Sequence, residues 1–356
     1  MARTIILTGG GSAGHTTPNL ALLPYLRKEG YKIHYIGSLD GIEKDIISNV
    51  PDITYHGIPC GKLRRYFSWK NFSDPFRIIN GYSQAKKLIN EINPDVVFSK
   101  GGFVSVPVVA AAHAKKVPVV SHESDITMGL ANKLSKPFAT HICLTFPDVL
   151  KEIQPPVGIY TGSPIRAELY TGDKEKGRAF LGFDHKPVLL MMGGSLGAQA
   201  INIALRAALP ELLKEMNVVH LCGKGNLDES LNDTKGYAQF EYISEELADI
   251  MALSDYILSR AGSNSIHEFL ALKKPMLLIP LPLSASRGDQ ILNAKSFTKR
   301  NFSITLEQEQ LTAETLLQAL KVLREKAPSM IAAMEAEPNA DGTKAIYDVI
   351  VKSRKK

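Results

Sequence analysis

Two short glycine loops hold the first residues of this chain whose types and spacing could do chemistry. Gly10-Gly-Ser-Ala-Gly14 follows an apolar run, and Gly193-Gly-Ser-Leu-Gly197 repeats the pattern in the second half. Glycines let an anion approach the backbone N–H groups, and a helix that begins there adds partial positive charge. One such loop is a weak signal, because glycine turns after a first strand are also common for steric reasons. Two copies in corresponding places favour phosphate binding.

A third stretch, Ser259–Gln290, combines cationic, amide and carboxylate groups. Arg260 follows an apolar strand, and Glu268 falls in the second turn of the helix after it. Asp289 and Gln290 end a polar loop after the next strand. Polar groups at the carboxyl ends of parallel strands are where α/β folds bind ligands. The stretch therefore predicts a polar ligand site.

Several common sites do not fit these motifs. Neither glycine loop carries the Gly-Lys-Ser/Thr of a P-loop, and the dinucleotide fingerprint fits poorly. Asp40 is the one acidic residue near the end of the second strand, so a dinucleotide enzyme stays a minor alternative. Cys60, Cys143 and Cys222 are scattered without a zinc spacing, which predicts reduced thiols and no metal.

Length and composition predict a soluble protein of two domains. The chain has 356 residues, of which 44% are hydrophobic and 22% charged. Its net charge of +6 suits anionic small molecules or an anionic membrane surface as well as nucleic acid. The first residues contain no signal peptide, and no apolar run reaches the length of a membrane span. We expect a cytoplasmic protein that could still lie on a membrane.

Apolar runs alternate with amphipathic stretches along the whole chain, which is typical of βαβ units and predicts mostly parallel sheets. Asp95-Val-Val-Phe-Ser-Lys-Gly-Gly also corresponds to Asp255-Tyr-Ile-Leu-Ser-Arg-Ala-Gly. We therefore expect two similar α/β halves joined near residues 163–170, with a final helix at about 341–356. The predicted strands are Thr4–Thr8, Lys32–Ile36, Asp95–Ser99, Pro118–Ser121, His141–Leu144, Gly158–Thr161, Val188–Met192, Val218–Leu221, Gln239–Tyr242, Tyr256–Leu258, Met276–Ile279 and Phe302–Thr305.

Six motifs, in order along nearly the whole chain, carry a resemblance to a known family. They are Gly10-Gly-Ser-Ala-Gly-His15, Lys100-Gly-Gly-Phe-Val-Ser-Val-Pro107, His122-Glu123, Gly162-Ser-Pro-Ile-Arg166, Gly193-Gly-Ser-Leu-Gly197 and Arg260-Ala-Gly followed by Glu268. Together they resemble the MurG family of peptidoglycan N-acetylglucosaminyltransferases.

The resemblance implies an α/β fold of GT-B type, with two Rossmann-like parallel-sheet domains facing a central cleft. Residues 1–164 with the C-terminal helix 339–356 would form the acceptor and membrane-side domain, and residues 165–338 the donor domain. The implied reaction is an inverting, metal-independent transfer of GlcNAc from UDP-GlcNAc. The acceptor would be the 4-hydroxyl of undecaprenyl-diphosphate-MurNAc-pentapeptide, which converts lipid I to lipid II.

Donor binding is assigned mainly to the second half. The sequence has no Asp-x-Asp metal motif, so Arg166, Ser195 and the N–H groups of the second glycine loop would neutralise the diphosphate. An ion pair is the alternative role for Arg166, an exposed helical position for Glu268, and a helix cap for Asp289. By the resemblance, Glu268 would bind the ribose, the main chain of Ile243 the uracil, Ser263 and Asn264 the nucleotide, and Asp289 and Gln290 the GlcNAc hydroxyls, with Ser12, Ala13 and Gly14 also on the donor.

Acceptor binding and proton transfer are assigned to the first half. Inverting transfer needs a base that takes the acceptor hydroxyl proton. His15 is the first candidate, with phosphate binding or backbone capping as its alternative roles. Asp125 is a second candidate, at a position where the family more often shows Asn, so the identity of the base stays open. The residues assigned to the acceptor and its phosphates are Gly10, Gly11, Gly14, Lys100 and Gly102.

Residues 61–87 interleave aromatic and basic side chains and include the single Trp of the chain. Such a patch suits the interface of an anionic bilayer, with Trp69, Phe72, Phe76 and Ile79 as contacts. A core-packing helix with basic ends is the alternative. We expect a peripheral protein on the cytoplasmic face of the cell membrane, with other cell-wall or division proteins as further candidate partners. No nucleic-acid-binding motif is present, so nucleic acid is not expected as a partner.

Three further functions share parts of this pattern. A GT-B enzyme with another acceptor is disfavoured by the acceptor-half motifs, Lys100–Pro107 and His122-Glu123. A UDP-GlcNAc 2-epimerase shares the fold but needs no lipid acceptor. A non-catalytic subunit would bind the nucleotide sugar without transferring it.

Overall fold

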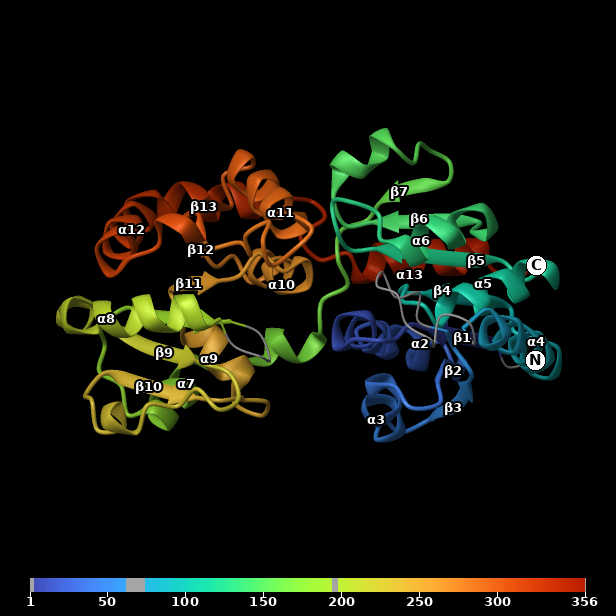
Figure 1. Ribbon diagram of the computed structural model, residues 1–356, viewed down its shortest axis with the longest axis horizontal. Helices are drawn as coiled ribbons and strands as arrows, with labels where there is room; N and C mark the ends of the chain where they lie inside the picture. Colours follow the sequence, from blue (N-terminus) through green and yellow to red (C-terminus); the bar gives the residue numbers. More distant parts are fainter. Residues whose placement is uncertain (1–2, 62–73, 194–197, 356) are drawn as a thin grey trace. The chain divides into compact units, whose positions relative to one another are not determined.

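Alternating apolar and amphipathic stretches fold into one parallel sheet in each half of the chain (Figure 1). The computed structural model describes residues 3–61, 74–193 and 198–355. One unit comprises Met1–Ile165 and Asp341–Lys356, and the other comprises Arg166–Ala340. The boundaries expected from the sequence lie one or two residues from these.

The first unit is built on seven parallel strands in the order β3-β2-β1-β4-β5-β6-β7. Buried side chains alternate between the two faces of β1, because Ile5 and Leu7 join one apolar cluster and Ile6 joins the other. A strand covered on both faces reads as a continuous apolar run, as this one does. The strands are β1 (Thr4–Thr8), β2 (Lys32–Ser38), β3 (Ile53–Ile58), β4 (Val96–Ser99), β5 (Val119–Glu123), β6 (His141–Leu144) and β7 (Gly158–Tyr160).

The last helix of the chain completes the core of the first unit (Figure 1). Ile346 and Ile350 are fully buried in the cluster that contains Ile5 and Leu7. The Thr343 hydroxyl accepts from the Ile165 N–H at 2.9 Å and fixes the start of this helix. The helices of the unit are α1 (Thr17–Leu20), α2 (Leu23–Lys28), α3 (Ile42–Ser48), α4 (Asp74–Ile92), α5 (Ser105–Ala114), α6 (Leu130–Ser135) and α13 (Thr343–Ser353).

The second unit is built on six parallel strands in the order β10-β9-β8-β11-β12-β13. Helices α8 and α12 pack against each other on this unit (Figure 1). The strands are β8 (Val188–Met192), β9 (Asn217–Leu221), β10 (Tyr237–Phe240), β11 (Tyr256–Ser259), β12 (Met276–Leu278) and β13 (Ser303–Thr305). The helices are α7 (Lys174–Leu181), α8 (Gln199–Glu215), α9 (Leu247–Leu253), α10 (Ser263–Ala271), α11 (Asp289–Lys299) and α12 (Ala313–Glu335).

Strand order fixes where each unit can hold a ligand. In both sheets the order runs outward from the first strand in one direction and then reverses at the fourth strand. The crevice of such a sheet lies outside the carboxyl ends of the strands at this switch point. The switch point lies between β1 and β4 in the first unit and between β8 and β11 in the second. The first glycine loop follows β1, so it lies at the switch point of its sheet.

The internal repeat of the sequence is also a repeat of contacts. The Asp95 carboxylate accepts from the N–H of Thr4, the first residue of β1, at 2.7 Å. The Asp255 carboxylate accepts from the N–H of Val188, the first residue of β8, at 2.8 Å. In each unit, therefore, an aspartate just before the fourth strand fixes the start of the first strand.

The predicted fold of two parallel-sheet domains is confirmed. Three strands have the predicted bounds, and β10 begins two residues before the predicted Gln239. The edge strand β3 was missed, because Ile53–Ile58 contains a glycine and polar residues rather than an apolar run. A central cleft between the domains stays a prediction. Within residues 3–61, 74–193 and 198–355, no helix is both long and apolar enough to cross a membrane.

Candidate functional site

Two backbone segments meet at the switch point of the first unit. The Gly10 N–H donates to the Gly101 carbonyl at 3.3 Å. Gly102 has a φ of +86°, and a Cβ on it would lie 2.1 Å from the Gly10 carbonyl oxygen. Gly101 also lies in the left-handed region, with a φ of +92°. Glycine is needed here both for its conformation and for the close approach of the two loops.

A buried carboxylate supports the first glycine loop. Glu43 is fully buried and accepts from the Gly11 N–H at 3.0 Å. It also accepts from the Ser38 N–H at 3.0 Å and the Ser38 hydroxyl at 2.5 Å. Burial alone would raise the pKa of Glu43, but these hydrogen bonds outweigh it and lower that pKa. Gly10 and Gly11 therefore use their N–H groups within the protein, and their phosphate contact stays a prediction.

The same loop positions His15 at the end of a short 3₁₀ turn, Ala13–His15. The Ser12 hydroxyl lies 3.0 Å from His15 Nδ1. Burial, and then the nearby Lys100 cation, lowers the pKa of His15 to about 4. The imidazole is therefore neutral at physiological pH and can accept a proton. Ser12 and Ala13, which are exposed, and the half-buried Gly14 lie beside it.

The loop after β5 is the third part of this site. Lys100 is 1% exposed, and its ammonium group donates to the Ser124 hydroxyl. Glu123 accepts from the Asp125 N–H at 3.1 Å. The charges of Glu123 and Asp125 both act on Lys100, so both carboxylates lie near the cation that also acts on His15. The predicted contact of Lys100 with phosphate stays a prediction, and its buried position favours a role within the protein.

In the second unit, Arg166 and Glu268 form a two-pronged ion pair. Arg166 Nε donates to one carboxylate oxygen of Glu268 at 2.8 Å, and an Nη donates to the other at 3.1 Å. Their side chains are 28% and 14% exposed, so solvent reaches both. Burial would lower the pKa of Arg166, but Glu268 more than offsets this and raises it. The sequence assigned these residues separately to the diphosphate and the ribose, and the structure places them in one cluster.

Glu268 lies on α10, five residues after the first residue of that helix. The helix begins at Ser263 after Gly262, and a Cβ on Gly262 would meet nothing within 4 Å. The backbone N–H groups of Ser263 and Asn264 lie at this helix N-terminus, and Ser263 is 6% exposed. Arg260 has a structural role, because it donates to the carbonyls of Ile279 and Pro280 at 3.1 and 3.3 Å.

The remaining residues with predicted donor contacts follow β10 and β12. They therefore lie beyond the carboxyl ends of the parallel strands. Ile243 is 6% exposed and lies in the loop after β10. Asp289 is the first residue of α11, whose N-cap is Gly288 with a φ of +86°. The Gln290 side-chain oxygen accepts from the Leu281 N–H at 3.1 Å and so shapes the loop after β12. The donor roles of these residues stay predictions.

Some predicted residues cannot be placed. Ser195 and the rest of the second glycine loop from 194 to 197 lie outside the described residues, as do Trp69 and Phe72. The side chain of Phe76 also lies outside the described part of the chain. Ile79 is described, and it is 66% exposed on α4.

Sequence reasoning missed Glu43, which now takes part in the site. The acidic residue considered after the second strand was Asp40, as a ribose ligand. In the structure it is Glu43, three residues later, that contacts the first glycine loop. An acidic residue in the first turn of a helix is common for reasons of helix stability, so its type and position gave no distinct signal. Only the fold brings it beneath Gly11.

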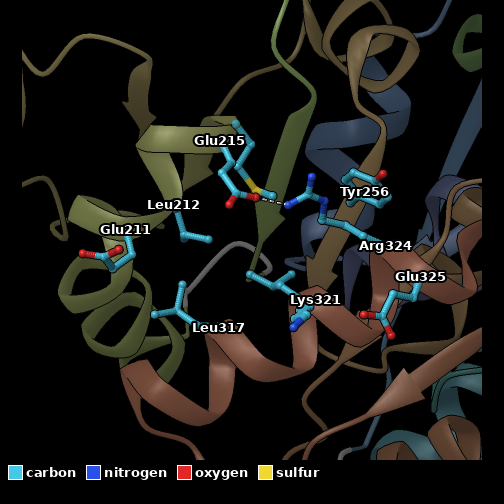
Figure 2. Close-up of a pocket in the computed structure, with 10 residues that line it drawn as sticks. Glu211, Leu212, Glu215, Tyr256, Leu317, Lys321, Arg324 and Glu325 are labelled. Atoms are coloured by element: carbon cyan, nitrogen blue, oxygen red, sulfur yellow. Dashed lines mark hydrogen bonds and ion pairs between the residues drawn. The ribbon is translucent and has the colours of Figure 1, made fainter.

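A groove of about 760 Å³ lies at the opposite edge of the second sheet, between α8 and α12 (Figure 2). Leu212 and Leu317 line its apolar part, and Glu215 and Arg324 form an ion pair on its wall. Tyr256, the first residue of β11, also lines it, which places the groove at the amino ends of the strands. None of the predicted site residues lines this groove.

Comparisons with known proteins match both halves of the chain. The model of the glycosyltransferase family 28 N-terminal domain matches residues 5–144, and that of the C-terminal domain matches residues 188–350. A UDP-N-acetylglucosamine--N-acetylmuramyl-(pentapeptide) pyrophosphoryl-undecaprenol N-acetylglucosamine transferase of Clostridium perfringens (strain SM101 / Type A) is 55% identical over 350 residues, 98% of each chain. A transferase of the same name from Clostridium botulinum (strain Alaska E43 / Type E3) is 55% identical over 352 residues, 99% of this chain and 98% of the relative.

Solved structures share the fold at lower identity. Acinetobacter baumannii MurG aligns with a TM-score of 0.78 and 23% identity, over 98% of this chain and 99% of that chain. A UDP-N-acetylglucosamine 2-epimerase aligns with a TM-score of 0.66 and 14% identity, over 99% of this chain and 95% of that chain. Two proteins with different names share the fold, so the fold alone does not decide the reaction.

The contact between Gly10 and Gly102 generates a stability prediction. Gly102→Ala should destabilise the first unit more than Gly30→Ala, because both glycines have positive φ but only Gly102 abuts another backbone. We expect Gly30→Ala to lower the free energy of unfolding by about 1–2 kcal/mol, and Gly102→Ala by at least about twice as much. Urea unfolding of both variants measures this difference. Equal losses would mean that the glycine loops can move apart without cost.

Proposed function

Since this chain belongs to glycosyltransferase family 28, we propose that it transfers N-acetylglucosamine from UDP-N-acetylglucosamine to undecaprenyl-diphosphate-linked N-acetylmuramyl-pentapeptide. The observation that carries the proposal is 55% identity over 98% of the chain to a curated transferase of this name. The resemblance to the MurG family that the six sequence motifs predicted is thereby confirmed. The enzyme is a UDP-GlcNAc-dependent hexosyltransferase of peptidoglycan synthesis, and it converts lipid I to lipid II.

The first unit binds the acceptor and removes its proton. His15 is neutral above pH of about 4 because burial and Lys100 lower its pKa, so the unprotonated imidazole is the first candidate to take the proton of the attacking 4-hydroxyl. Asp125, whose charge also acts on Lys100, is the second candidate for this role. The N–H groups of Gly10 and Gly11 are already paired, whereas Ser12 and Ala13, which the sequence assigned to the donor, are exposed, so we extend their role to the acceptor diphosphate.

The second unit binds the donor. The helix N-terminus at Ser263 offers N–H groups to the nucleotide, and the Glu268 carboxylate accepts from the ribose hydroxyls. Arg166, held in place by Glu268, supplies the positive charge for the departing diphosphate. Transfer is therefore expected to proceed without a metal cofactor, and no other cofactor is needed because UDP-GlcNAc is the substrate.

The protein acts at the membrane because its acceptor is lipid-linked. The aromatic and basic composition of residues 61–87 suits an anionic bilayer surface, and Ile79, in the described part of this stretch, is exposed. We place the enzyme as a peripheral protein on the cytoplasmic face of the cell membrane, on its anionic lipids. Other cell-wall or division proteins are its candidate partners, and nucleic acid is not.

The first test of the function offers labelled UDP-GlcNAc and a polyprenyl-diphosphate-linked muramyl peptide to the purified protein. Label should enter the lipid-linked product equally well with and without EDTA. Release of UDP with conversion of UDP-GlcNAc to a free epimer would indicate the epimerase instead. UDP binding without transfer to any acceptor would leave only a binding subunit, and loss of transfer in EDTA would refute metal independence.

The second prediction concerns the donor site. Glu268→Gln should raise the KM for UDP-GlcNAc by about tenfold or more, because a charged acceptor of hydrogen bonds is replaced by a neutral amide. The acceptor KM should stay unchanged. Glu325→Gln is the matched control, because Glu325 lines the groove at the opposite edge of the same sheet. If both variants keep the wild-type donor KM, Glu268 serves only to hold Arg166.

The third prediction concerns membrane binding. Changing both Trp69 and Phe72 to Ser should weaken binding to vesicles of anionic lipid by at least about tenfold. The reason is that two aromatic rings proposed to insert into the bilayer interface are lost. Activity on a soluble acceptor analogue should persist. Cosedimentation with vesicles measures the first effect, and undiminished binding would place these side chains in the protein core.

A further inference from the structure

Lys100 is a buried charged group that the transfer chemistry described above leaves without a task. It is 1% exposed and follows β4 at the switch point of the first unit. A lysine is rarely buried this completely unless its ammonium group has partners. Burial lowers the pKa of Lys100 to about 8, while Glu123 and Asp125 act in the opposite direction. The side chain is therefore still largely protonated at neutral pH.

The contacts of Lys100 join three segments of the site. The backbone N–H of Lys100 donates to the carbonyl of Thr8, the last residue of β1, at 2.9 Å. Its Cβ lies so close to Gly9 that a Cβ added there would be only 3.2 Å away. Its ammonium group donates to Ser124, in the loop after β5. The side chain thus spans from the glycine loop that carries His15 to the loop that carries Asp125.

We propose that Lys100 is a positioning residue whose buried ammonium group holds the first glycine loop and the loop after β5 together and sets the electrostatic environment of both base candidates, His15 and Asp125. This inference rests on the proposed function only for the role of those two residues as bases. It gives Lys100 a role through its neighbours, in place of direct contact with the acceptor phosphates.

The charges around His15 make the direction of the effect definite. Lys100 and burial lower the pKa of His15, whereas the Gly10 backbone and the Glu43 carboxylate on α3 raise it. On the loop after β5, the charged groups are Glu123 and Asp125. On β2, the Tyr35 hydroxyl donates to the Gly9 carbonyl and is neutral, because burial raises its pKa. Removing the Lys100 cation leaves the Glu43 carboxylate acting on His15, so protonation of the imidazole becomes easier.

The same charge acts favourably on Asp125. A cation near a carboxylate favours its ionised form, and the interaction strengthens as water is excluded. A single buried ammonium group therefore favours the proton-accepting state of an imidazole and of a carboxylate at once. The effect does not depend on which of the two residues takes the acceptor proton.

The experiment measures the titration of His15 by NMR in the unliganded protein, with the signal assigned from a His15→Asn variant. Lys100→Met and Lys100→Gln remove the charge, and the second of these keeps a polar group for Ser124. Either variant should move the His15 midpoint upward from about 4 by about one pH unit. Lys100→Arg should keep the wild-type midpoint, because it restores the charge.

Lys274→Met is the matched control. Lys274 is also a largely buried lysine, and its ammonium group donates to the carbonyls of Ala252 and Ser254 at 3.1 and 2.7 Å. It belongs to the second unit, so its loss should not move the His15 midpoint. Thermal unfolding of each variant shows which of them are folded. If Lys100→Met is not folded, Lys100→Gln provides the test.

The kinetic arm measures kcat/KM for transfer as a function of pH. In Lys100→Met and Lys100→Gln, the acid limb should move to higher pH, and Lys100→Arg should restore it. A His15 midpoint that does not move, or a loss of activity by the same factor at every pH, overturns the proposal. If the wild-type protein shows no transfer at all, the proposed function fails, but the NMR titration still decides the role of Lys100.

Discussion

The close approach of two backbones at Gly10 and Gly102 is the constraint on which the rest of the first site depends. Parallel strands in this order bring the loops after β1 and β4 to the same point, and side chains on either loop would keep them apart. With no Cβ in the way, the loops meet through main-chain atoms. Glu43 can then reach the Gly11 N–H from α3, and Lys100 can lie under the first loop. The glycines thus determine where the charged groups go.

The second unit repeats this architecture with a different use of its charges. Lys100 and Arg260 are equivalent residues of the repeat, and each reaches the loop that follows the next strand. Lys100 has one donor contact there and faces carboxylates, whereas Arg260 is held by two carbonyls and by Gln308. One cation is therefore placed to influence titrating groups, and the other fixes a loop. An equivalent position in a repeat preserves geometry, but the neighbours decide the chemistry.

Much of the fold could be predicted from the sequence, because buried parallel strands are apolar runs and glycine loops follow them. Pairings between distant residues could not. Arg166 and Glu268 are 102 positions apart, and no local pattern shows that they meet. The burial of Lys100 was also hidden, since a lysine after a strand usually faces water. The six motifs identified the family, and the structure added how their residues contact one another.

The path of the chain has a consequence for how the protein is made. The second unit is continuous, from Arg166 to Ala340, whereas the first needs both ends of the chain. Domains generally fold as they leave the ribosome, amino-terminal parts first. Here the first unit lacks Ile346 and Ile350 until the last helix has been synthesised, although its sheet is complete much earlier. The nascent first unit therefore exposes one apolar face while the second folds, and α13, which is synthesised after the second unit, is the element that covers it.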